Sequence, residues 1–470
     1  MRKWLRMAGI GSAWLQLAAS ATGAEALPLE AAIEQALAHN RELVRGALDL
    51  QGDRLALEQA QTAVRNVQLV PEGTAGAGSA GREWRAGLRA EATGAYGTRV
   101  SAGAAARQIA VDGGADVRRG EIRVAVSQPL FRDFGPLVRN EPVALASDSL
   151  LAARRAWERD RSALVVRVVE LYEALILLRH QIERDEAFAA RMERLWALAD
   201  ARERQGRAAR TEVLRMDLQR GEAAARLEAE RSQLEVQFRE FADLLGRDLE
   251  AEFRLTPPAL LALEIPDAAA ALAVALDERP DYAQALQDID TADRQLRLAR
   301  RGLLPDVTLA ATQTRYGEGA DWSAAGDLDQ EDWFAGLTAD MNLDLRGARL
   351  AAARAGVDAE SRRQVAEIVR SRLALEVETA LAAYRRTRTE LDIAGRNRGL
   401  AANRAELARA LFEVGRAGAD PVSDAEADQI EAELKELAAR RAASVAAYRL
   451  LHVLGTLVPA PPELLRTARK

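Results

Sequence analysis

The sequence predicts a mainly α-helical protein with a β-barrel portion, built from two structural repeats that each contain long coiled α-helices and two strands. Three observations lead to this class. Only 4% of the 470 residues are aromatic, whereas 49% are hydrophobic and 29% are charged, which is typical of long helices packed through small side chains. Four short segments alternate apolar with polar or small residues, as half-buried strands do. The same order of segments occurs twice along the chain.

The N-terminus has the organisation of a secretory signal peptide. Basic residues within the first six positions precede a mostly apolar run from Met7 to Ala19, and small residues follow it up to Ala24 or Ala26. We therefore expect residues 1–26 to direct export, with cleavage after Thr22-Gly23-Ala24 or after Ala24-Glu25-Ala26. A retained membrane anchor is the alternative, but the run is short for a spanning helix.

Very long helices are predicted on both sides of Gly206. No glycine or proline interrupts residues 143–205, and a continuous helix there would be about 95 Å long at about 1.5 Å per residue. Its apolar residues step alternately by four and three, which predicts a coiled-coil seam. A second helix with a similar rhythm follows and ends at Gly246. The seam of the first helix consists of Leu164, Val168, Leu171, Leu175, Leu178 and Ile182.

The alternating segments predict strands at residues 84–96, 122–127, 307–312 and 333–343. The first would span about 40 Å when fully extended, at about 3.3 Å per residue. A tilted strand of that length can cross a bilayer. An aromatic residue also lies near each end of the apolar face of this strand. The edge of a soluble sandwich is the alternative. Two hairpins cannot close a barrel alone, so lipid-facing strands would require a barrel shared between subunits.

Internal repetition sets the domain organisation. Gly206-Arg207-Ala208 matches Gly415-Arg416-Ala417, and Gly246 matches Gly455 at the same offset of 209. Near the repeat starts, Ala36-Leu37 matches Ala275-Leu276 at an offset of 239. We expect a first repeat at residues 27–246, with its helical tip near 206, and a second at 269–456, with its tip near 415. Residues 247–268 form the predicted linker, and residues 457–470 form a C-terminal tail.

The chain resembles the outer-membrane efflux factors of the TolC type. Five pieces carry the resemblance in the expected order: Ala36-Leu37-Ala38-His39-Asn40, Ser127-Gln128-Pro129-Leu130-Phe131, Ala275-Leu276-Asp277-Glu278-Arg279-Pro280-Asp281, Leu304-Pro305-Asp306-Val307 and residues 347–359. The resemblance implies a homotrimer in which four strands from each subunit form a twelve-stranded outer-membrane barrel. A helical tunnel would continue this barrel through the periplasm.

The same resemblance implies the function and the partners. The protein would be the exit duct of a tripartite efflux or type I secretion system in the outer membrane of a Gram-negative-type bacterium. It would contact outer-membrane lipid, a periplasmic adaptor (membrane fusion) protein and an inner-membrane pump. The adaptor would meet the two helical tips, for which the expected contact residues are Gly206, Arg207, Val414, Gly415 and Arg416.

The strands and the periplasmic entrance supply the candidate site residues. The strand periodicity assigns two faces. The expected lipid-facing residues are Trp84, Leu88, Tyr96, Trp333, Leu337 and Met341. The expected lumen-facing residues are Arg85, Arg89, Glu91, Thr338 and Asp340. By resemblance Asp420 and Asp424 would form an acidic gate that favours cations. For Asp420, an acidic residue favoured by the dipole at a helix start is an equally good interpretation.

Composition and motifs argue against several other classes. The net charge is −6 with 65 basic and 71 acidic residues, so the basic footprint of a nucleic-acid-binding protein is lacking. The chain has no cysteine, and its three histidines, His39, His180 and His452, lack metal-site spacing. Phosphate-loop, dinucleotide and Gly-x-Ser-x-Gly motifs are also missing, so we expect neither an enzyme nor a cofactor or metal site. The rival class is an exported periplasmic coiled-coil scaffold or adhesion stalk without a pore.

Overall fold

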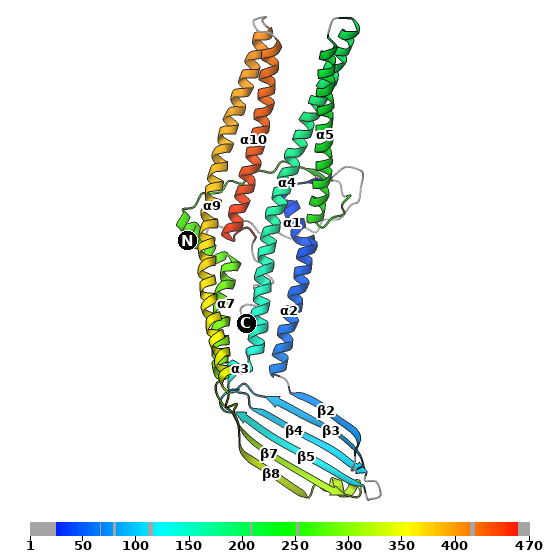
Figure 1. The fold of residues 1–470 in the computed structure, drawn as a ribbon, viewed down its shortest axis with the longest axis vertical. Helices are drawn as coiled ribbons and strands as arrows, with labels where there is room; N and C mark the ends of the chain where they lie inside the picture. The colour runs from blue at the N-terminus through cyan, green and yellow to red at the C-terminus, as the bar shows by residue number, and fades with distance from the viewer. Residues whose placement is uncertain are drawn as a thin grey trace, which may run out of the picture.

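A computed structural model describes residues 25–65, 67–78, 81–110, 116–206, 209–250, 253–413 and 419–458. The molecule is elongated, with long helices side by side in a column and a six-stranded sheet continuing the column at one end (Figure 1). Helices make up most of the described chain. The predicted class, a mainly helical protein with a sheet, is therefore confirmed.

Each half of the chain runs from a short strand and two helices through strands of the large sheet to a pair of long helices, but the halves differ in the number of sheet strands and in the short helices α3 and α8. The elements of the first half are β1 (Glu25–Leu27), α1 (Leu29–His39), α2 (Arg41–Arg65), β2 (Gln68–Gly78), β3 (Gly81–Thr93), β4 (Arg99–Ala110), β5 (Val117–Pro129), α3 (Pro136–Arg139), α4 (Glu141–Arg204) and α5 (Arg210–Leu244). Those of the second half are β6 (Phe253–Leu255), α6 (Ala268–Glu278), α7 (Pro280–Arg301), β7 (Asp306–Gly319), α8 (Trp322–Gly326), β8 (Gln330–Asp340), α9 (Arg346–Glu413) and α10 (Ala419–Leu454).

Helix α4 runs over 64 residues, as the lack of glycine and of an interior proline predicts. Pro142 occupies its first turn, where a missing N–H costs no helical hydrogen bond. The helix ends before Gly206, whose φ of 69° is the left-handed conformation that terminates helices. The predicted seam is confirmed as a buried stripe, with Val168 and Leu175 fully buried. Much of the stripe packs on α1, β1 and α5.

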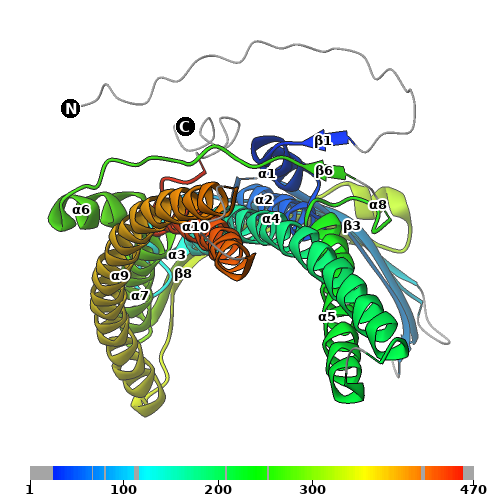
Figure 2. The same cartoon turned by 90° about the horizontal axis from the view of Figure 1, so that it is seen from above.

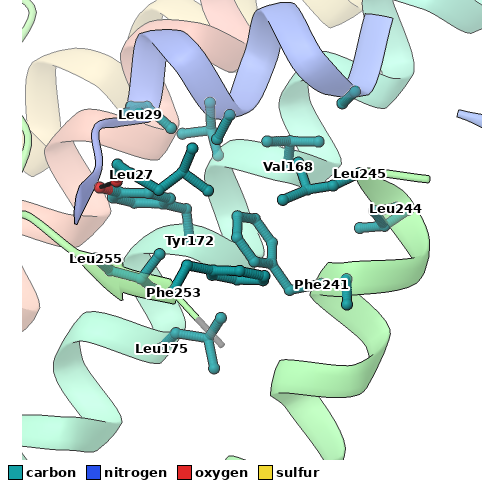
Figure 3. Close-up of a cluster of buried hydrophobic side chains, with 14 of the residues drawn as sticks. Leu27, Leu29, Val168, Tyr172, Leu175, Phe241, Leu244, Leu245, Phe253 and Leu255 are labelled. Atoms are coloured by element: carbon teal, nitrogen blue, oxygen red, sulfur yellow. Dashed lines mark hydrogen bonds between the residues drawn. The ribbon is translucent and has the colours of Figure 1, made fainter. Parts of the chain in front are cut away.

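An apolar core surrounds the middle of α4. Tyr172 is fully buried there, and its ring meets the ring of Phe241 edge-on at a centroid distance of 5.9 Å (Figure 3). The Tyr172 hydroxyl lies 2.8 Å from the carbonyl oxygen of Leu27 and accepts a hydrogen bond from the backbone N–H of Thr256 at 3.0 Å. One side chain thus fastens β1 and the segment after β6 to the long helix.

The second half repeats this arrangement. Tyr384 on α9 is also fully buried, and its hydroxyl accepts a hydrogen bond from the backbone N–H of Leu263 at 2.9 Å. Around it, Leu381 and Leu450 belong to a second apolar cluster that includes Ala275 of α6. Each long helix therefore carries a buried tyrosine that holds an outer segment of the chain.

Two glycines at equivalent places close the returning helices. Gly246 follows α5 with a φ of 70°, and Gly455 follows α10 with a φ of 77°. A Cβ atom on Gly246 would lie 2.1 Å from the carbonyl oxygen of His39, and one on Gly455 would lie 3.0 Å from that of Glu278. Each glycine therefore lets a helix end pack against the C-terminus of α1 or α6. The matched pairs have the offsets of 209 and 239 found in the sequence.

Charged side chains link the two halves near the sheet. Arg294 on α7 donates to Glu141 at 2.9 Å and also pairs with Asp148, both on α4. Asp148 additionally accepts hydrogen bonds from Gln287 at 2.9 Å and from Thr291 at 3.1 Å. Because these groups are largely shielded from solvent, the network holds α7 in a fixed register on α4.

A buried carboxylate in the core gives a pH-dependent prediction. Glu173 is only 6% exposed, and burial raises the pKa of its carboxyl above the usual value, while Arg440 and Arg441 act in the opposite direction. A raised pKa means that the folded state binds the proton more tightly, so stability falls as pH rises from about 4.5 through that pKa. We expect Glu173→Gln to stabilise the fold by about 1 kcal/mol at pH 8 and by less at pH 5.

Thermal unfolding at the two pH values checks this expectation. Glu240→Gln, which changes an exposed carboxylate of α5, is the control and should have little effect at either pH. A Glu173→Gln variant that is destabilised at pH 8 would show that the carboxylate makes a favourable interaction there.

The large sheet corrects the strand count expected for the first repeat. Its order is β2-β3-β4-β5-β7-β8, and all neighbouring strands are antiparallel. The first half of the chain contributes four strands instead of two, whereas the second half contributes the expected pair. The predicted strand 84–96 ends at Thr93, and the predicted strand 333–343 ends at Asp340. Chain reversals in the glycine- and alanine-rich tract, such as the turn between β3 and β4, create the additional strands.

A short two-stranded sheet lies beside the helical column. Strand β1 pairs in parallel with β6, with Glu25 opposite Phe253 and Leu27 opposite Leu255. The strand begins directly after Ala24, the first of the two expected cleavage positions. Cleavage at that position would keep β1, whereas cleavage after Ala26 would remove two of its three residues.

Candidate functional site: two faces of one sheet

The strand register decides which side chains share a face of the large sheet. Residues directly opposite each other in an antiparallel pair lie on the same face. Leu88 lies opposite Ala104, which in turn lies opposite Ile122. Farther along the sheet, Leu309 lies opposite Leu337. Following these pairs from β2 to β8 places the apolar positions of all six strands on one face.

This apolar face is open in the monomer except at the end remote from the helical column, where α8 packs over Gly120 and Gly317. Trp333 is 71% exposed and Leu337 is 64% exposed, although both lie within a regular strand. Contiguous exposed apolar patches are rare on water-soluble proteins and indicate a partner or a membrane. The other large apolar side chains on this face that are also exposed are Leu69, Trp84, Leu88, Val100, Ile122, Val124, Val126 and Leu309.

The opposite face carries a network of charges. Arg85 donates to Glu121 at 2.7 Å, across the intervening strand β4, and Arg119 lies 3.6 Å from the same carboxylate. Farther along β3, Arg89 pairs with Glu72 of β2 at 3.1 Å. Charged side chains of this kind are stable where water can solvate them, so this face is suited to contact with water.

Aromatic residues mark both ends of the sheet. At the end remote from the helices, the rings of Trp84 and Trp322 lie 5.4 Å apart. At the helical end, Tyr96 stacks on Phe134 at 5.7 Å. Aromatic side chains are favoured at membrane interfaces because a flat apolar ring can carry a polar group. The two groups therefore bracket the apolar face as a pair of girdles would.

The structure groups the predicted strand residues by face as follows. Trp84, Leu88, Trp333 and Leu337 lie on the apolar face. Tyr96 lies in the turn after β3, and Met341 directly follows β8, so neither belongs to a strand. The residues on the opposite face are Arg85, Arg89, Glu91, Thr338 and Asp340. The alternation thus places each strand residue relative to the others, while contact with lipid or lumen stays a prediction.

The second candidate region is the end of the column opposite the sheet, where both helical hairpins reverse (Figure 1). Gly206 directly follows the C-cap of α4 there. Arg207, Val414, Gly415 and Arg416 lie outside the described residues. Asp420 falls at the start of α10, and Asp424 is exposed on its first turns. Their roles in adaptor contact and gating remain predictions.

The helices between these two regions form a curved wall. Viewed along the column, α9, α10, α4 and α5 follow an arc, and β1, β6 and α6 lie on its convex side (Figure 2). A wall with this curvature can form part of a tube.

Sequence reasoning missed strand β2 and did not resolve β4. The even positions of β4 from Val100 to Ala106 alternate with Ser101, Gly103 and Ala105, but three of the four even positions are alanine. Such small side chains give a weak periodic signal. Tyr172 and Tyr384 were missed as well, because a single buried tyrosine in a long apolar stripe has no signature of its own.

None of the helices in the described part of the chain is both long and apolar enough to cross a membrane. Among the same residues, no group of three or more histidine, aspartate and glutamate side chains is arranged to hold a metal ion.

Comparison with known proteins places the second half of the chain. Residues 271–456 match the sequence model of the family described as outer membrane efflux protein. This part of the chain is therefore similar to outer membrane efflux proteins. The match begins within α6 and ends just after α10, so it includes β7, β8 and the second helical hairpin.

Solved structures extend the likeness to both halves. CmeC of Campylobacter jejuni, an outer membrane channel, has a TM-score of 0.69 at 14% identity, over 94% of this chain and 88% of CmeC. VceC of Vibrio cholerae, an outer membrane protein, has a TM-score of 0.64 at 17% identity, over 91% of this chain and 96% of VceC. The open state of the MtrE outer membrane channel of Neisseria gonorrhoeae has a TM-score of 0.64 at 16% identity, over 91% of this chain and 89% of MtrE. At these identities the likeness establishes a shared fold, which confirms the resemblance to TolC-type factors. Comparison with curated protein sequences gives no significant match.

Proposed function

We propose that this protein is the outer-membrane exit duct of a tripartite efflux or type I secretion system. The observation that carries the proposal is the sheet with one exposed apolar face and one ion-paired face, attached to a curved helical wall. Lipid would cover the apolar face, and the charged face would line water. The efflux-protein family of residues 271–456 supports the same function.

The assembly follows from the incomplete wall and the open sheet. One copy supplies an arc and a sheet with two edges, so closure requires further copies around one axis. We assign a homotrimer in the outer membrane, with the helices in the periplasm. An adaptor protein and an inner-membrane pump would join at the end where the hairpins reverse. We also retain the division into repeats at 27–246 and 269–456.

Fractionation and conductance test this function. The protein is expected to stay in outer membranes washed with high salt or urea, and the purified trimer to conduct ions in planar bilayers. A scaffold or adhesion stalk without a pore would be washed off and would not conduct. Release by urea together with the absence of channels would refute the exit duct.

Asp424 gives a test of the proposed gate. Because a carboxylate ring at a constriction binds cations and repels anions, Asp424→Ala is expected to reduce cation selectivity and block by divalent cations severalfold. Single-channel recording in planar bilayers measures both properties. Asp428→Ala, four residues farther along α10, is the control because Asp428 already pairs with Arg404 on α9. Unchanged selectivity and block in Asp424→Ala would remove Asp424 from the gate.

A further inference from the structure

The large sheet ends in two strands that each have one neighbour among the described residues. Strand β2 pairs with β3, and strand β8 pairs with β7. Each therefore leaves one row of backbone N–H and C=O groups without a strand partner. If the apolar face lies in lipid, as the proposed function requires, these groups cannot be hydrated and must be paired with another strand.

We propose that β8 of one copy pairs with β2 of the next, so that three copies close a cylinder of eighteen strands instead of twelve. The inference rests on the proposed function and deepens it. The partner at each edge is a second copy of this chain. Relative to a twelve-stranded cylinder closed between β4 and β8, the hairpin of β2 and β3 is the part that each copy adds to the wall of the duct.

The two edges are matched in direction and length. Strand β2 leaves the helical column after α2, and β8 returns to the column before α9 (Figure 1). They consequently run in opposite senses and would extend the antiparallel pattern of the whole sheet. Both strands contain 11 residues. Pro71 lacks an N–H, which removes one possible ladder bond from one side of β2.

The hairpin of β2 and β3 is an integral part of the sheet. Its register with β4 is continuous from Arg82 opposite Ala110 to Thr93 opposite Arg99. On the charged face, Arg85 of β3 reaches Glu121 of β5 at 2.7 Å. A hairpin standing outside a twelve-stranded cylinder would have to break this register and this ion pair.

Simple geometry supports the larger cylinder. At the level of α2, α4, α7 and α9, three copies give twelve helices, whose axes at about 9 Å spacing form a ring of about 110 Å circumference. Eighteen strands about 4.8 Å apart and tilted by about 40° enclose about 110 Å, whereas twelve enclose about 75 Å. Eighteen strands therefore continue the helical ring without narrowing, and at equal tilt the cylinder is about 1.5 times as wide.

Cysteine cross-linking of the full chain in outer membranes tests the inference. The natural chain has no cysteine, so each introduced pair is the only source of thiols. Ala335→Cys on β8 is combined in turn with cysteine at every odd-numbered position of β2 from Leu69 to Ala77. All these positions share the apolar face, and the series covers the possible offsets between the two edges. The rival pairing is probed by Ala335→Cys with Ala104→Cys on β4.

We expect at least one β2–β8 combination to yield covalent dimers and trimers on oxidation, seen by denaturing electrophoresis without reductant. The β4–β8 pair should yield only monomer. The pair Ala86→Cys and Ala106→Cys, opposite each other on β3 and β4, should form a disulfide within one chain and serves as the oxidation control.

Two results would overturn the eighteen-stranded cylinder while leaving the duct intact. One is intermolecular cross-linking through the β4–β8 pair. The other is an uncross-linked but native, heat-modifiable trimer in the whole β2–β8 series. A chain without cysteines that proves monomeric and non-conducting would instead refute the proposed function, and the cylinder with it.

Discussion

Leu88→Arg is expected to abolish assembly of the trimer in the outer membrane. Leu88 lies near the middle of β3, is 48% exposed and shares the apolar face with Ala104 and Ile122. An arginine on the lipid face near the bilayer midplane costs about 2–4 kcal/mol, and a trimer would carry three of them. The summed cost of about 6–12 kcal/mol is comparable to the whole stability of a typical domain.

The control for this variant changes a charge on the other face of the same strand. Glu91→Gln removes a carboxylate that lies 3.9 Å from Arg89, at a side chain that is 33% exposed. We expect a normal yield, because a weak surface pair contributes little. Heat-modifiable trimer in outer-membrane fractions is the measurement. Equal losses in the two variants would contradict the assigned faces.

Gly246→Ala is expected to destabilise the first half of the chain by more than about 3 kcal/mol. The left-handed backbone alone costs an alanine roughly 1–2 kcal/mol. The larger contribution is steric, because the new Cβ would lie 2.1 Å from the His39 carbonyl oxygen and would push α5 away from α1. This contact closes the core around Tyr172 and Phe241, so its loss should expose that core.

Gly221→Ala is the matched control, because Gly221 lies within α5 and nothing lies within 4 Å of a Cβ placed there. Alanine in a helix interior should stabilise by about 0.5–1 kcal/mol. Thermal unfolding and limited proteolysis of the two variants distinguish the cases. A Gly246→Ala protein with wild-type stability would show that α1 and the end of α5 can separate at little cost.

The helical part of this protein was predictable from local pattern. The absence of glycine and proline over residues 143–205 predicted α4, because nothing in that stretch interrupts helical hydrogen bonding. Two glycine-bounded matches at an offset of 209 predicted the return of both hairpins. The helix and its ends depend on residues close together in the chain, so they can be predicted without knowing the fold.

The faces of the sheet were predictable as well, since alternation along a strand fixes which side chains point the same way. Trp84 and Leu88 were grouped correctly with each other, and so were Trp333 and Leu337. The sequence did not show that the apolar residues of β3 and β8 lie on the same face of the sheet, because this depends on the register through β4, β5 and β7. The predicted gate and tips remain open to the experiments above.

The sequence by itself determined the long helices and the alternation of faces, because both are encoded in the spacing of nearby residues. It also determined the duplicated order of the helices, because segments 209 or 239 residues apart match. Only the tertiary structure decided that the first half supplies four strands and that Gly246 lies against His39. The physical reason is that strand pairing and backbone contact join segments far apart in the chain. Alanine and glycine, which dominate the tract from β2 to β4, permit these contacts without specifying them.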